Sequence, residues 1–135
     1  MFNLMNIASS GLAAANVELS VTANNLANIN TTSGPNGQPF QEQSTILQSA
    51  PAAGSGPDAG VGQGVEVAAI VASNAPYTPV YDPTSPLANA QGDVLYPNVS
   101  LQTEMPNLIQ ASAAYNANAT AFTAAKTIDQ KALTL

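Results

Sequence analysis

The sequence predicts a mainly α-helical fold, in which helices at the two chain ends form an antiparallel coiled-coil hairpin that carries a small, loop-rich β insert. Apolar residues recur every seven positions in residues 1–30 and 99–135, a spacing typical of helices packed along a partner helix. The middle segment, residues 31–98, holds all but one of the ten prolines and all but one of the nine glycines. These three segments of the 135-residue chain are expected to be its structural units.

The first helix is expected to run from Asn3, a candidate N-cap, to about Ile29. Gly11 is its weak point, because glycine loses much conformational freedom in a helix. One seven-residue stripe consists of Met5, Leu12, Leu19 and Leu26. A second stripe, three residues further on, consists of Ala8, Ala15, Thr22 and Ile29.

Four asparagines crowd the end of this helix, although asparagine is a mediocre helix former. Asn30 can end a helix in the left-handed conformation. The neutral amides of Asn24, Asn25 and Asn28 can enter a packed interface without burying a charge. Capping and solvent exposure explain Asn30 well, but they explain the three earlier amides less well.

The middle segment is expected to contain short β elements joined by turns. A strand over Phe40–Gln48 follows a turn at Gly34–Gly37, and alternating residues predict another strand over Val65–Val71. Ala50–Gly64 has the composition of a flexible loop, and Asn89–Asp93 is typical of a turn. This segment is too short and loop-rich to be an independent enzyme domain.

The last helix is expected to start near Glu104, with Thr103 as its N-cap, so that Pro106 falls in the first turn. Residues Val99–Gln102 can form a frayed lead-in to it. Alanines beside its stripes, Ala111, Ala125 and Ala132, would let a neighbouring backbone approach closely. The first stripe consists of Leu101, Leu108, Tyr115 and Phe122. The second, interrupted at Lys126, consists of Met105, Ser112, Ala119 and Leu133.

Small side chains return little hydrophobic area for the backbone entropy that their ordering costs, so an isolated pair of these helices is expected to be marginal. The helices also lack the charged outer face of a monomeric hairpin. Their surfaces are therefore predicted to meet other protein subunits. The predicted assembly interface comprises Met5, Leu12, Leu19, Asn24, Asn25, Leu26, Asn28, Leu101, Met105, Leu108, Tyr115, Asn118 and Phe122.

Charge and residue usage exclude several functions. Charged residues make up 7% of the chain, the net charge is −6, and the only cations are Lys126 and Lys131. Nucleic acid and anionic membranes are therefore not expected partners. Without histidine or cysteine, and with the carboxylates scattered singly, no catalytic, metal or cofactor site is expected. The amino-terminal residues lack the pattern of a cleavable signal peptide, and no apolar run is long enough to cross a membrane.

Several motifs resemble those of the rod and hook proteins that form the axis of the bacterial flagellum. The amino-terminal matches are Gly11–Ala14 and Ala23–Thr31, and the carboxy-terminal matches are Asn98–Val99, Glu104–Met105, Asn107–Ile109 and Ala114–Ala119. In the middle, Ser33–Phe40, Tyr81–Pro83, Pro86–Asn89 and Tyr96–Val99 are similar to the C-type proximal rod proteins. Ala114 and Gln41 depart from basic residues usual in the family.

The resemblance implies a structural rod subunit, exported uncleaved by the flagellar type III apparatus and assembled in the periplasm with copies of itself and other rod proteins. It implies a helical tube that transmits motor torque, with the terminal helices forming an inner coiled-coil layer around the export channel. Two alternatives stay open: a soluble secreted helical-hairpin binding module, and another axial subunit such as the B-type rod protein.

Overall fold

The computed structural model describes residues 2–51 and 62–133. Helix α1 spans Phe2–Ala27 and helix α2 spans Leu101–Leu133. Between them lie four strands: β1 (Gln43–Ser49), β2 (Val65–Ala72), β3 (Thr78–Tyr81) and β4 (Asp93–Tyr96). The prediction of a mainly helical fold with a small β insert is confirmed. Most of the predicted Ala50–Gly64 loop lies outside the described residues.

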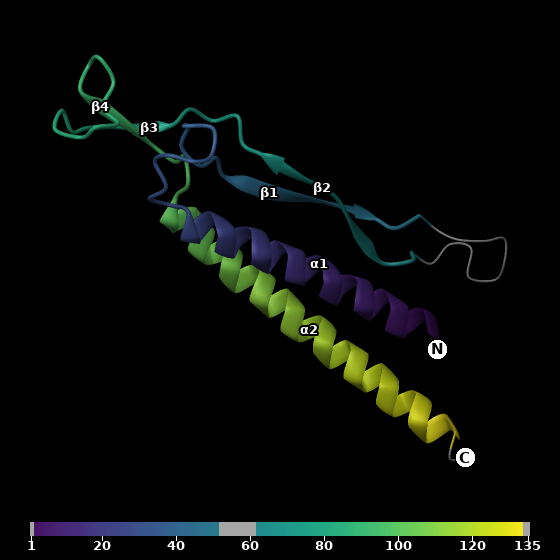
Figure 1. Cartoon of the computed structure of the whole chain (residues 1–135). Coiled ribbons are helices and arrows are strands. Elements are labelled where there is room, and N and C mark those ends of the chain that lie inside the picture. The colour runs from purple at the N-terminus through teal and green to yellow at the C-terminus, as the bar shows by residue number, and fades with distance from the viewer. Residues whose placement is uncertain (1, 52–61, 134–135) are drawn as a thin grey trace.

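The two helices lie side by side and run in opposite directions (Figure 1). Asn25, near the end of α1, is hydrogen-bonded to Glu104, near the start of α2. Gly11, in the first half of α1, lies against the side chain of Asn118, further along α2. A methyl group on Gly11 would collide with the Asn118 amide, so the glycine that looked like a weak point allows a close helix contact.

The buried face of α2 differs from the predicted one. Among the described elements α2 packs closely on α1 alone, so its buried residues mark the face between the helices. Met105, Ser112 and Leu133 of the predicted second stripe are exposed, and so is Leu101 of the first. In their place, small or polar side chains allow the backbones to approach: Glu104, Ala111 and Ala125 are buried, and Asn118 is half-buried. Leu108 and Phe122 are half-buried on the same face, as expected.

Neither predicted N-cap is correct. Asn3 lies inside α1, which already begins at Phe2, and therefore does not cap it. Helix α2 begins at Leu101, because the Ser100 carbonyl accepts hydrogen bonds from the amides of Thr103 and Glu104. Pro106 then lies beyond the first turn and has no N–H for the Gln102 carbonyl. Gln102 is exposed, so water can satisfy that carbonyl.

The strands form two separate antiparallel hairpins. In the first, β1 pairs with β2 from Gln43↔Ala72 to Ser49↔Val65, with an irregularity between Ile46 and Leu47. This β1–β2 hairpin lies along α1 (Figure 1). In the second, β3 pairs with β4, and this hairpin lies past the end of the helical pair and contacts neither helix (Figure 1). Strand β3 was not predicted, because it contains a proline, Pro79, which a two-stranded sheet tolerates at its edge.

The hydrophobic core of the described residues is small and consists mostly of alanine. Its members are Ala8, Ala14, Ala15, Val21, Val94, Ala111 and Ala125. The large apolar side chains lie mainly outside it, and the exposed ones include Ile46, Ile70, Leu101, Met105, Ile109 and Ile128. Much of the apolar surface of this chain therefore remains uncovered in a single copy.

Candidate assembly interface

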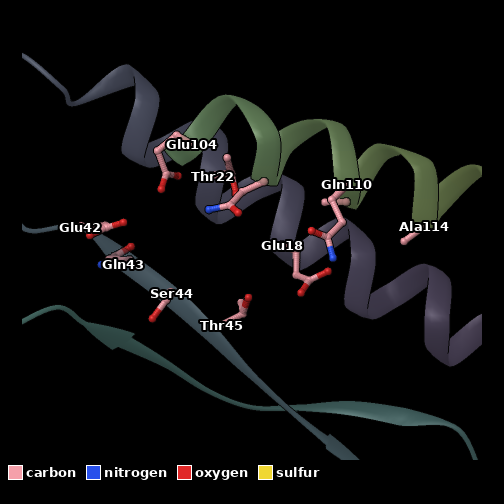
Figure 2. Close-up of a pocket in the computed structure, with 11 residues that line it drawn as sticks. Glu18, Thr22, Glu42, Gln43, Ser44, Thr45, Glu104, Gln110 and Ala114 are labelled. Atoms are coloured by element: carbon pink, nitrogen blue, oxygen red, sulfur yellow. The ribbon is translucent and has the colours of Figure 1, made fainter. Parts of the chain in front are cut away.

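A buried polar junction joins α1, β1 and α2. At its centre the Asn25 side chain is only 1% exposed. Its Nδ2 donates to the Gln43 carbonyl at 2.7 Å and to Glu104 Oε2 at 3.0 Å, and its Oδ1 accepts from the Gln43 N–H at 2.9 Å. Figure 2 shows Glu104 of α2 directed toward Glu42 and Gln43 at the start of the strand. One amide thus connects three elements that are far apart in the sequence.

This junction explains part of the asparagine run. A neutral amide can pair with both backbone groups of Gln43 and still donate to a carboxylate, which no other uncharged side chain except glutamine can do. Asn24 and Asn28 are used differently. The Asn28 Nδ2 donates to the Asn24 carbonyl at 2.9 Å, and the Asn24 Nδ2 reaches Gln43 Oε1 at 3.3 Å. Asn25 is therefore a buried connector, while Asn24 and Asn28 organise the end of α1.

A polar groove of about 290 Å³ lies between α1, the start of β1 and α2 (Figure 2). Three carboxyl groups line it, from Glu18, Glu42 and Glu104, and neither lysine does. Burial raises the pKa of Glu42, and the hydrogen bond with Glu104 and the negative charge of Glu104 raise it further. Within the described residues no group of three or more acidic, histidine or cysteine side chains is placed to hold a metal ion.

A second polar contact ties the β1–β2 hairpin to the first half of α1. Ser10 Oγ donates to the Ile7 carbonyl at 2.7 Å and accepts from the Val65 N–H at 3.1 Å. The preceding residue, Gly64, has φ +106° and passes so close to Ser10 that a Cβ there would overlap its hydroxyl. The hairpin is therefore fixed to α1 at the starts of both of its strands.

The predicted interface residues divide between the inside and the outside of the molecule. Asn25 is buried, and those half-buried are Met5, Leu12, Leu19, Leu26, Asn28, Leu108, Asn118 and Phe122. Exposed are Asn24, Leu101, Met105 and Tyr115. Most of the predicted interface residues are thus partly covered within one chain, whereas the exposed group is fully accessible to a neighbour.

Two exposed apolar surfaces stand out. The outer ridge of α2 consists of Leu101, Met105 and Ile109, which are 51%, 43% and 66% exposed. Sequence reasoning missed Ile109, although its four-residue spacing from Met105 places it on the same helix face. The α1 groove, about 510 Å³, lies between α1 and β2 and is lined mainly by Ala13, Val17, Ser20, Val21, Asn24 and Ile70.

Paired terminal helices, a core of alanines and uncovered apolar surfaces are typical of a structural subunit that packs against other protein chains. Residues 5–35 match the family model described as flagella basal body rod protein. Residues 90–135 match the model described as flagellar basal body rod FlgEFG protein C-terminal. Within the described residues no helix combines the length and the apolar character needed to cross a membrane.

Full-length relatives narrow the assignment. The flagellar basal-body rod protein FlgC of Salmonella typhimurium is 41% identical, over 100% of this chain and 97% of the relative. FlgC of Borreliella burgdorferi is 38% identical over the same shares, and FlgC of Bacillus subtilis is 37% identical over 98% and 95%. The chain belongs to the FlgC family and is a structural subunit of the flagellar basal-body rod. Because the relatives are structural rod proteins, the prediction that it is not an enzyme is confirmed.

Proposed function

We propose that this chain polymerises with copies of itself and with other rod proteins into the periplasmic rod, a tube that surrounds the export channel and transmits torque. In this proposal the flagellar type III apparatus exports the chain without cleaving it. The observation that carries the proposal is the contrast between a core made mostly of alanine and the many large apolar residues left exposed. Neighbouring subunits supply the burial that a single chain lacks.

The helical pair is proposed to form the coiled-coil layer of the tube wall. The residues on the face of α2 that meets α1 follow steps of four and three: Glu104, Leu108, Ala111, then Tyr115 at the exposed edge of this face, Asn118, Phe122 and Ala125. That alternation is the seven-residue repeat of a coiled coil. Alanine at two of these positions favours a short distance between the helix axes.

The outer ridge of α2 and the α1 groove are proposed to meet between neighbouring subunits. Asn107, Gln110 and Ala114 of α2 line the polar groove on the hairpin side, and the helical repeat places the outer ridge on the other side. The α1 groove opens beside β2. Different surfaces on different sides give a head-to-tail contact, and such a contact builds a helical polymer when the rotation between subunits does not close a ring. Neither surface contains a charged side chain.

The test is a charge placed on the outer ridge. Ile109→Asp is expected to abolish rod assembly and swimming, because a neighbour would bury an unpaired carboxylate. Circular dichroism of the purified variant should match the wild type, since Ile109 is 66% exposed in a single copy. The matched control is Ala117→Asp, on an exposed position of the same helix away from the ridge. Normal swimming of the Ile109 variant would exclude the ridge as a contact surface.

A further inference from the structure

Hydrogen bonds hold the main chain of Glu42 and the side chain of Glu104 in place. The Glu42 N–H donates to Asn98 Oδ1 at 2.9 Å, and its carbonyl accepts from the Ser73 N–H at 2.7 Å. Glu104 is 2% exposed and is fixed by Asn25. Both carboxyl groups line the polar groove, and Figure 2 shows Glu104 directed toward Glu42.

Two carboxyl groups can hydrogen-bond to each other only when one of them carries a proton, because an ionised carboxylate is only an acceptor. The other titratable group facing this pair is Glu18 of α1, which is also acidic. β1 and β2 contribute no lysine, and Lys126 and Lys131 lie in the opposite half of α2 from Glu104. No basic side chain in the groove lining offsets the repulsion that follows when both groups ionise.

We propose that the Glu42–Glu104 pair is a proton-operated latch, in which one shared proton holds the start of β1 against the helical pair. When the proton leaves, the repulsion between the two carboxylates weakens the adjoining Asn25–Gln43 hydrogen bonds. The β1–β2 hairpin then stays tied to α1 mainly through Ser10 and Val65. The latch adds a conformational response to a subunit whose family role is structural.

The direction of the pH response follows from linkage. The folded-state pKa of Glu42 lies above its ordinary value of 4.5, so the folded chain binds the proton more tightly than the unfolded chain does. The stabilisation is complete below that ordinary pKa and is lost as pH rises through the raised pKa. This direction is opposite to that of a carboxylate paired with a lysine, whose stabilisation is lost as pH falls.

The test is amide hydrogen exchange of the full-length chain between about pH 4.5 and pH 8, expressed as protection relative to the intrinsic rate. The reporter is the Gln43 N–H, and the reference is the Asp82 N–H, which donates to the Gly92 carbonyl in the other hairpin. Protection of Gln43 should fall relative to Asp82, up to about tenfold for each unit by which the pKa is raised. Glu42→Gln should keep high protection at every pH, because its amide donates without ionising.

Glu66→Gln is the matched control, since Glu66 is an exposed glutamate of the same hairpin, and it should keep the wild-type pH dependence. Equal pH dependence in the wild type and Glu42→Gln, or a flat wild-type profile, would overturn the latch. The second measurement uses sedimented polymer and carbon-13 spectra of labelled glutamate side chains. In these spectra, one carboxyl group that titrates above the ordinary range, and that is missing from the Glu42→Gln variant, supports the latch. Titration of all the glutamates over the same pH range refutes it.

Discussion

Asn25 is the residue whose loss tests the polar junction most directly. Asn25→Ala removes the bonds to both backbone groups of Gln43 and the bond to Glu104. Glu104 is 2% exposed, so its carboxylate loses a donor that water cannot easily replace, at a cost of about 1.5–3 kcal/mol. Gln43 is half-buried and can regain water, so its two lost bonds add about 1 kcal/mol together. The expected loss in the free energy of unfolding is therefore about 3 kcal/mol.

The assay is urea unfolding of the full-length chain followed by circular dichroism at pH 7. A domain of this size has a total stability of roughly 5–15 kcal/mol, so this loss is a large fraction of it. The matched control is Asn24→Ala, which removes the neighbouring, exposed asparagine. Its expected change is within about 0.5 kcal/mol, as for most surface substitutions. Equal unfolding midpoints for the two variants would refute the assignment of Asn25 as the connector.

Two further substitutions test close contacts along α1. Gly64→Ala should lower the free energy of unfolding by about 2 kcal/mol, because the φ of Gly64 is +106° and a Cβ there would strike Ser10. The control Gly62→Ala should change the free energy of unfolding little in the same urea assay, because no atom lies near the position of its Cβ. Ala111→Leu should lower the free energy of unfolding by about 1–3 kcal/mol and block rod assembly, because the larger side chain forces α2 away from α1. The control Ala113→Leu, at an exposed position, should do neither. Unfolding midpoints of Ala111→Leu equal to those of the wild type would show that the helices do not meet at Ala111.

Much of the fold could be predicted from the sequence, because periodicity is a local signal. The seven-residue stripes indicated both helices, turn residues and alternation indicated the strands β1 and β2, and only a turn was predicted where β4 begins. Two features of the fold could not be predicted from local patterns. Strand β3 contains Pro79, which argues against a strand in a single-sequence reading. The start of α2 at Leu101 depends on the Ser100 backbone carbonyl, which accepts the first helical hydrogen bonds. Every residue has such a carbonyl, so the sequence does not mark this position.

The candidate interface was harder to predict, for a different physical reason. Periodicity shows which positions share a helix face, but it does not show which face meets a partner. The prediction placed large side chains such as Met105 inside, whereas the structure places small ones such as Ala111 there. The asparagine run is evident in the sequence, yet the partners of Asn25 lie 18 and 79 residues further along the chain. No local pattern identifies contacts at such separations.

The alanine-rich seam leaves the register of the two helices to polar groups. Alanine buries little area, so a seven-residue shift of α2 along α1 would lose little apolar contact from the alanines of the seam. The same shift would separate Glu104 from Asn25 and leave a buried carboxylate without its donor. It would also remove Asn118 from the space that Gly11 provides. The polar contacts therefore select one alignment, and the apolar surface that remains exposed is available for the proposed contacts with neighbouring rod subunits.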